Sequence, residues 1–218
     1  MVKTAHGLLW MILALVAALV GCTAQPSSAV TPSEVATGTP RAVETPMPTV
    51  CVLPTVLAPT PPAEAPGYTQ LDPDTGLHMT GKPQQIDLES YHLQITGKVD
   101  HPLSLTYDDL RCLPKVETTT TLTCPGFFVD EATWAGAPMR DVLAMVGVQE
   151  GVFGLRLIGA DGYSTSVPLA TALSETSLLA YEWEGEPLPI LHGFPVRAVF
   201  PGEPGSSWAK WLVEIKVY

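Results

Sequence analysis

Three side chains that could bind an anion, His192, Arg197 and Lys210, lie in one stretch that is rich in glycine and proline. These glycines and prolines fix the local backbone, and the apolar runs 198–200 and 211–213 bury its flanks. An arginine binds phosphate through paired hydrogen bonds, and a lysine adds a point charge. The stretch therefore predicts a rigid pocket for an anionic ligand.

The chain as a whole carries the opposite charge, with a formal net charge of -11 at pH 7. An acidic protein does not attract anions nonspecifically, so an anionic ligand needs a local pocket. The same acidic balance excludes nucleic acid as an expected partner, because nucleic-acid binding relies on clustered basic residues.

The cysteines offer a second kind of chemistry. Cys112 and Cys124 lie close together in the sequence and could form a disulfide, worth about 2–3 kcal/mol for a short loop, or remain as two buried thiols. Alternatively, Cys124 is a metal ligand: it ends a run of β-branched residues and enters a Pro-Gly turn, so its sulfur would project from a strand end into a loop-lined pocket. Thiolates suit soft transition metals. Cys51 has no assigned role.

The amino-terminal residues 1–22 are predicted to be an export signal. The apolar run 8–20 is shorter than the roughly 20 residues of a membrane-spanning helix, and it ends in LVGC, which resembles a bacterial lipobox. Cys22 is then the lipid-modified residue, and the protein is exported and anchored to the outer face of the cytoplasmic membrane or elsewhere in the cell envelope. A plain secretory signal cleaved near Ala24 and an uncleaved anchor are the alternatives.

Composition divides the remainder of the chain in two. Residues 23–76 are rich in proline, threonine and alanine, and they predict a disordered spacer, because such a segment buries too little apolar surface to offset its ordering entropy. Residues 77–218 have the size and composition of one globular domain.

Within that domain, strands and short helices are interspersed without a regular βαβ repeat, which predicts an α+β fold with a mixed sheet. A short helix begins after the N-cap candidate Thr106 and ends before Pro114, and a second ends at Gly147. Residues 134–138 predict a turn. The predicted strands are 91–97, 116–124, 153–158, 163–167, 178–183, 196–200 and 212–218, and the predicted helices after the first are 139–146 and 169–173.

Several ordered motifs resemble the molybdopterin-binding domain of the sulfite oxidase family, which includes the bacterial periplasmic methionine-sulfoxide reductases. They are LTCPG (122–126), WAGAPMRDVL (134–143), DGY (161–163), LLAYE (178–182), GEPLP (185–189), HGFPVR (192–197) and KWL (210–212). The resemblance covers residues 91–217 and implies the fold and a molybdenum-molybdopterin cofactor.

The resemblance also implies roles for single residues. Cys124 corresponds to the catalytic cysteine whose sulfur ligates molybdenum. Taken singly, His192 could be a loop histidine with satisfied hydrogen bonds and Arg197 a surface ion pair. Taken together, the implied cofactor-binding residues are His192, Arg197, Trp208, Ala209, Lys210 and Asp161.

Two departures from the family bear on the substrate. After the ligand cysteine, animal and plant sulfite oxidases continue through glycine and asparagine to arginine, whereas this chain continues with PGFFVD. The region of an upstream substrate-binding arginine is occupied by residues 79–82, where Lys82 cannot replace an arginine fork. Sulfite is therefore not the expected substrate.

The leading hypothesis is a membrane-tethered, molybdopterin-dependent oxidoreductase that transfers an oxygen atom to or from a small molecule. The sequence contains no haem-attachment motif, so electrons are expected to pass to or from a separate carrier, a cytochrome or membrane subunit. One alternative is an envelope binding module that keeps the fold without the cofactor. Another is a structural domain with a Cys112–Cys124 disulfide, which excludes metal ligation by Cys124.

Overall fold

The structure, a computed structural model, describes residues 51–218. The predicted signal peptide and Cys22 lie outside the described residues. Within residues 51–218, no helix is both long and apolar enough to cross a membrane.

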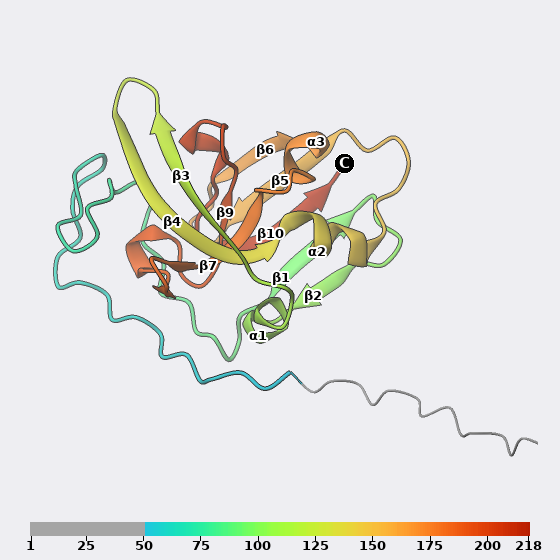
Figure 1. Ribbon diagram of the computed structural model, residues 1–218, viewed down its shortest axis with the longest axis horizontal. Helices are drawn as coiled ribbons and strands as arrows, with labels where there is room; N and C mark the ends of the chain where they lie inside the picture. Colours follow the sequence, from blue (N-terminus) through green and yellow to red (C-terminus); the bar gives the residue numbers. More distant parts are fainter. Residues whose placement is uncertain (1–50) are drawn as a thin grey trace, which may run out of the picture. The chain divides into compact units, whose positions relative to one another are not determined.

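The first sheet contains the first and the last strand of the described residues, β1 (Leu93–Gly97) and β10 (Leu212–Val217) (Figure 1). These two strands pair in parallel, whereas all other pairs of the sheet are antiparallel. The predicted mixed sheet and α+β class are thus confirmed. The strand order is β2 (Leu103–Leu105), β1 (Leu93–Gly97), β10 (Leu212–Val217), β5 (Gly154–Gly159) and β6 (Ser164–Pro168).

The second sheet is antiparallel and carries a long hairpin that extends beyond the rest of the fold (Figure 1). Cys124 ends the first strand of this hairpin, as predicted from the β-branched run before it. The order is β3 (Val116–Cys124), β4 (Phe128–Pro138), β7 (Leu178–Trp183) and β8 (Glu186–Pro187), with β9 (Arg197–Val199) also paired to β7.

The helices are short and begin and end where their capping residues indicate. Helix α1 (Tyr107–Arg111) has Thr106 as its N-cap in a reciprocal capping box with Asp109. Helix α2 (Met139–Val146) ends at Gly147, whose φ of 66° is left-handed. The remaining helical turns are α3 (Leu169–Ala172), η1 (Ile190–His192) and η2 (Gly205–Ser207).

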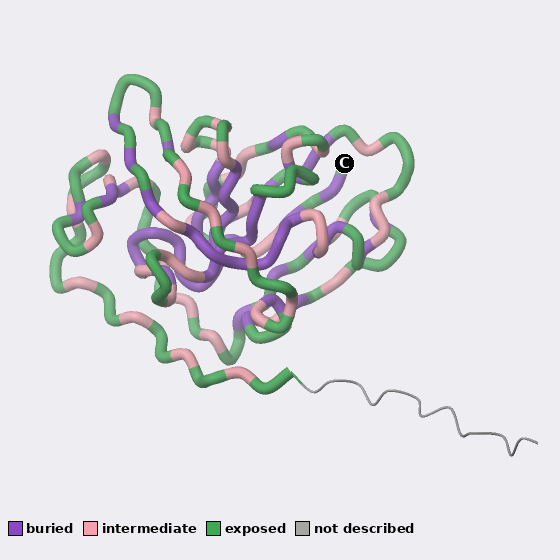
Figure 2. The backbone as a smooth tube through the Cα atoms, in the orientation of Figure 1, coloured by how far each residue is buried: buried purple, intermediate pink, exposed green. Residues whose placement is uncertain are grey.

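One apolar core is built from both sheets, and its buried backbone appears purple in Figure 2. Leu93 and Leu157 contribute from the first sheet, and Ala137 and Leu179 from the second, all of them fully buried. Apolar burial of this kind is the dominant stabilising contribution to a domain of this size. The core fixes the strand ends from which the site residues project.

The turn predicted for residues 134–138 is wrong, because strand β4 continues through it to Pro138. The glycine of this motif allows two strands to pack closely. A Cβ atom on Gly136 would lie 2.0 Å from the carbonyl oxygen of Leu179 in β7. The register between β4 and β7 shifts between Ala135 and Gly136. Small residues are required here by the neighbouring backbone, whereas the sequence pattern suggested chain reversal.

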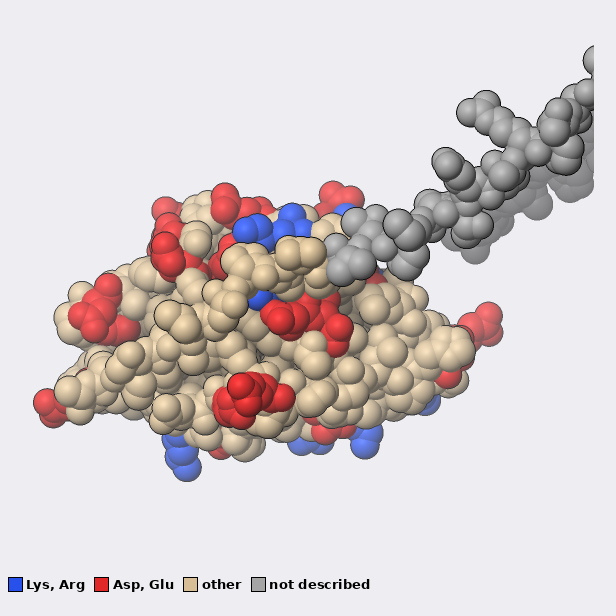
Figure 3. Space-filling view, turned by 90° about the horizontal axis from the view of Figure 1, so that it is seen from below, with Lys and Arg blue, Asp and Glu red and all other residues tan. Residues whose placement is uncertain are grey.

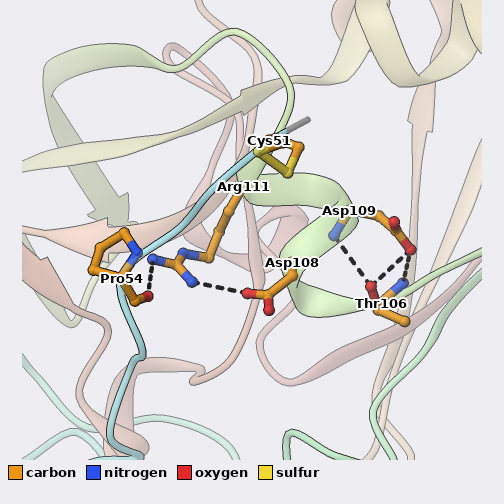
Figure 4. Close-up of a disulfide and its surroundings, with 7 residues drawn as sticks. Cys51, Pro54, Thr106, Asp108, Asp109 and Arg111 are labelled. Carbon is orange, nitrogen blue, oxygen red and sulfur yellow. Dashed lines mark hydrogen bonds and ion pairs between the residues drawn. A yellow bond between two sulfur atoms is a disulfide. The ribbon is translucent and has the colours of Figure 1, made fainter. Parts of the chain in front are cut away.

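The segment 51–76, predicted as part of a mobile spacer, is attached to the globular domain. Cys51 forms a disulfide with Cys112 at the end of α1, beside which Arg111 binds the carbonyl oxygen of Pro54 (Figure 4). Further along, Asp72 is buried. The compact unit includes all of residues 51–76, so it begins upstream of the predicted boundary at residue 77.

The same disulfide corrects the proposed Cys112–Cys124 pairing, since Cys112 is bonded to Cys51 and Cys124 is a free thiol. The sequence offered no local signal for this partner. The two bonded cysteines are 61 residues apart, and their approach depends on how the segment packs against α1.

We expect Cys51→Ser to lower the free energy of unfolding by up to about 4 kcal/mol, because the disulfide restricts a long loop of the unfolded chain. Urea unfolding followed by tryptophan fluorescence measures this change. A reducing agent should lower the wild-type midpoint toward that of the variant and leave the variant unchanged. An unshifted wild-type midpoint after complete reduction would contradict the expectation.

Candidate functional site

A small cavity opens beside the free thiol. Residues far apart in the sequence converge on it, because the ends of strand β3 and the η1 turn, the start of strand β9 and the loop before β10 all border it. Six of the seven residues predicted from the sequence to form one site line this cavity or its neighbouring cavity. Those lining this cavity are Cys124, His192, Arg197, Trp208 and Lys210.

Cys124 is half-buried at the tip of the β3–β4 hairpin. Its carbonyl oxygen accepts a hydrogen bond of 3.0 Å from the backbone N–H of Phe127, which closes the tight turn. Burial, followed by the negative charge of Asp130, raises the pKa of the Cys124 thiol above its ordinary value. A thiol in this environment stays protonated near pH 7 until a cation displaces its proton.

Arg197 is a buried cation without a carboxylate partner. Its guanidinium carbon lies 4.3 Å from the ring centroid of Trp134 and 5.7 Å from that of Trp208. Its Nη1 donates to the carbonyl oxygen of His192 at 3.1 Å, whereas its buried Nε has no hydrogen-bond partner, and it forms no salt bridge within residues 51–218. Burial lowers its pKa to about 9.

Lys210 adds a second buried positive charge. Its Nζ donates hydrogen bonds of 3.0 Å to the carbonyl oxygens of Thr80 and Leu191. Burial, then repulsion from Arg197, lowers the pKa of Lys210 well below its ordinary value. Because the chain has only 11 lysines and arginines, the placement of two of them around one cavity concentrates positive charge where an anion could offset it.

The exterior has the opposite character. On the face shown in Figure 3, acidic side chains are scattered widely, and lysine and arginine side chains form small separate groups. The cationic cavity is thus an interior feature of an acidic protein. This arrangement agrees with the expectation that an anionic ligand is bound locally.

His192 is held by two residues of the segment 51–76, Asp72 and Thr75. Its Nε2 lies 2.8 Å from the Asp72 carboxylate and 3.0 Å from the Thr75 hydroxyl, and the imidazole is buried. Burial, then Lys210, lowers its pKa to about 3. Although burial opposes it, hydrogen bonding by Thr75 and His192 lowers the pKa of Asp72 overall. His192 is therefore a neutral imidazole near pH 7 that donates Nε2–H to Asp72.

This arrangement makes stability sensitive to acid. The unfolded His192 gains a proton below pH about 6.5, whereas the folded form resists protonation down to pH about 3, so stability falls as the pH falls through this window. We expect thermal or urea unfolding to show a loss of roughly 2 kcal/mol between pH 7 and pH 5 that is absent in His192→Gln. The exposed His92→Gln should retain the loss. Parallel pH profiles for wild type and His192→Gln would contradict the expectation.

The other predicted residues have distinct positions. Asp161 lines a second, larger cavity, which also reaches Cys124, Trp208 and Lys210. Its carboxylate accepts the backbone N–H of Tyr163 at 3.0 Å and thereby shapes a turn. Ala209 is fully buried and lines neither cavity, and its carbonyl oxygen accepts the N–H of Ala198 at 2.9 Å.

Sequence reasoning missed four polar residues at the site: Asp72, Thr75, His78 and Asp130. The first two lie within the segment predicted as a spacer. A signal was present there, because the composition changes at residues 72–76 from proline, threonine and alanine to DPDTG, a turn-forming sequence. That change could have moved the predicted boundary upstream.

The donor set fits a molybdopterin-type group on two grounds. A free thiol faces the cavity and can bind a soft metal. Arg197 and Lys210 lack carboxylate partners within the described chain, and the unpaired Nε of Arg197 is a buried donor that an anionic ligand could satisfy. Residues that could hold the metal and the anionic part of one group therefore share a cavity.

The fold and this cavity define an α+β cofactor-binding domain with one thiol and two buried cations. The sequence model of the family described as "Oxidoreductase molybdopterin binding domain" matches residues 79–218. The chain belongs to this family. The family resemblance predicted from the ordered motifs is confirmed, and with it a molybdenum cofactor.

Relatives support the same assignment over the same region. An uncharacterized oxidoreductase, YuiH of Bacillus subtilis, is 38% identical over 62% of this chain and 69% of its own length. Mitochondrial sulfite oxidase of Homo sapiens is 38% identical over 61% of this chain. In the crystal structure of the sulfane dehydrogenase SoxCD from Paracoccus pantotrophus, the similar chain gives a TM-score of 0.59 at 28% identity, covering 62% of this chain and 40% of that one.

The chain covers different shares of the lengths of these relatives. It spans 30% of the length of the human sulfite oxidase, although it covers more than two thirds of YuiH.

Proposed function

We propose that this protein is a membrane-tethered, molybdopterin-dependent oxidoreductase that transfers an oxygen atom to or from a small molecule. The observation that carries the proposal is the shared cavity of the free Cys124 thiol and the buried, carboxylate-free Arg197, in a chain of the molybdopterin-binding family. When bound, molybdopterin would supply two-electron redox chemistry that none of the protein's own side chains provides.

The chain's own residues would bind and orient this group. Cys124 Sγ would ligate the metal, and Arg197 with Lys210 would hold the anionic phosphate. Neutral His192, fixed through Nε2 by Asp72, would present its other ring nitrogen in a defined orientation. Trp134 and Trp208 pack on the Arg197 guanidinium and keep water away from it.

The proposed substrate and partners are inferred from the sequence. The substrate would be a small molecule other than sulfite, because residues 79–82, where sulfite oxidases have a substrate-binding arginine, contain no arginine. Electrons would pass to or from an external carrier, a cytochrome or a membrane subunit. A lipid on Cys22 would hold the protein at the outer face of the cytoplasmic membrane. Membrane fractionation of wild type and Cys22→Ala tests the tether, since the variant should lose membrane association.

The decisive experiment measures cofactor in the full-length chain produced by a host that makes molybdopterin. Elemental analysis should give about one molybdenum per chain, and oxidative release should give the matching fluorescent pterin. A known molybdopterin enzyme produced in the same host serves as the loading control. If that enzyme is loaded and this protein contains neither molybdenum nor pterin, the proposal fails, and the cofactor-free envelope module becomes the better description.

A further inference from the structure

A second polar cluster, formed by His78 and Asp130, lies at the same cavity as Cys124. The buried Asp130 carboxylate accepts two hydrogen bonds from one residue, the His78 backbone N–H at 2.8 Å and its Nδ1 at 2.6 Å. The His78 imidazole also stacks on the Phe128 ring, with ring centroids 4.5 Å apart and planes 7° from parallel. The ring is therefore fixed in one orientation.

This geometry leaves one ring nitrogen available. A carboxylate accepts, so Nδ1 carries the proton shared with Asp130. Nε2 has no hydrogen-bond partner within residues 51–218. A histidine held through one nitrogen by a carboxylate and open at the other is a common arrangement for contact with a reacting group.

His78 is also more exposed than the other histidine and the two buried cations on this cavity. Its side chain is 27% exposed, whereas His192, Arg197 and Lys210 are all below a tenth. It reaches the cavity from the segment before β1, which is joined to β4 by the hydrogen bond from the His78 N–H to Asp130. A substrate must enter from solvent, so His78 lies where it would arrive.

Charge separates this cluster from the phosphate-binding residues. Asp130 offsets any positive charge on His78, and a phosphate placed next to that carboxylate would be repelled. Arg197 and Lys210 have no such carboxylate partner. The His78–Asp130 pair thus suits a single hydrogen bond to a small polar group better than it suits a dianion.

We propose that His78, oriented by Asp130 and Phe128, binds the oxygen atom of the substrate through Nε2, and that the substrate is a small uncharged oxo compound such as an S-oxide. This inference rests on the proposed function. It adds a substrate-binding residue that lies outside residues 79–218, the part matched by the family.

Two substitutions distinguish the role of Nδ1 from that of Nε2. In His78→Asn, the side-chain amide can still donate to Asp130, as Nδ1 does, but nothing replaces Nε2. In His78→Gln, the amide can occupy the Nε2 position. The exposed His101→Gln is the matched control.

The measurements are the Kd of dimethyl sulfoxide for the molybdenum-loaded protein by calorimetry, and the KM for dimethyl sulfoxide with a reduced redox dye as electron donor. His78→Asn should weaken binding by about 10-fold at unchanged molybdenum and pterin content, as expected for one lost hydrogen bond to a polar ligand. His78→Gln should recover part of this loss, and His101→Gln should match wild type.

The outcomes distinguish the two proposals. A wild-type protein without cofactor refutes the proposed function. A loaded wild type that does not bind dimethyl sulfoxide, or a loaded His78→Asn that binds it as wild type does, overturns the assignment of His78. Loss of cofactor from His78→Asn also overturns it, because His78 would then belong to the cofactor site.

Discussion

Replacing Cys124 with alanine is expected to reduce oxidoreductase activity by at least about 100-fold, because residues that only orient metal ligands already cost 10–100-fold. Molybdenum content should fall in parallel. The apo domain should lose less than about 1 kcal/mol of stability, since the thiol is half-buried at a strand end and forms no disulfide. Activity, elemental analysis and urea unfolding together test this result.

The neighbouring Thr123→Ala is the matched control, because Thr123 is exposed on the same strand and lines neither cavity. It should retain both metal and activity. Full activity and full molybdenum content in Cys124→Ala would show that another residue ligates the metal.

Arg197→Met is expected to separate stability from function. The buried guanidinium has no carboxylate partner, and burial lowers its pKa to about 9, so the charged form costs folding free energy at every pH below about 9, and the cost is relieved only above it. A methionine of similar length removes that charge and still packs between Trp134 and Trp208. Apo Arg197→Met should therefore be at least as stable as wild type at pH 7.

The same substitution should reduce cofactor content to less than about a tenth, since a charge-assisted contact to phosphate contributes about 1.5–3 kcal/mol. Arg197→Lys should retain more than Arg197→Met, although it lacks the paired donors of a guanidinium. The exposed Arg156→Met should change neither property. An apo Arg197→Met that is clearly destabilised, or one that loads fully, would contradict this expectation.

Local signals predicted much of the fold. Helix α2 has the predicted bounds because a left-handed glycine ends it, and α1 begins after Thr106 because the cap is encoded within four residues. Arg197 and Lys210 were predicted to share a pocket from their local stretch, but Cys124 could be joined to them only through the family motifs, because their meeting depends on strand pairing between distant segments.

The remainder depended on contacts that no local pattern encodes. The bond between Cys51 and Cys112 and the contact between Asp72 and His192 both join a proline-rich segment to distant parts of the domain. The composition of that segment predicted mobility, because composition does not reveal the individual residues that attach a segment to the domain. The small residues 135–137 indicated a turn, whereas the close approach of β7 explains them.

If the protein is anchored through Cys22, the Cys51–Cys112 bond also sets the length of the linker between the anchor and the domain. With the disulfide formed, residues 23–50 separate the anchor from the domain, and 28 residues can span at most about 100 Å. Without the disulfide and the other contacts of the segment 51–76, the linker would extend to residue 76 and could span almost twice that distance. The volume accessible to the domain scales with the cube of the linker length, so these attachments would raise the local concentration of a membrane-bound redox partner several-fold. A covalent link remote from the cavity would thereby influence how often electrons are exchanged.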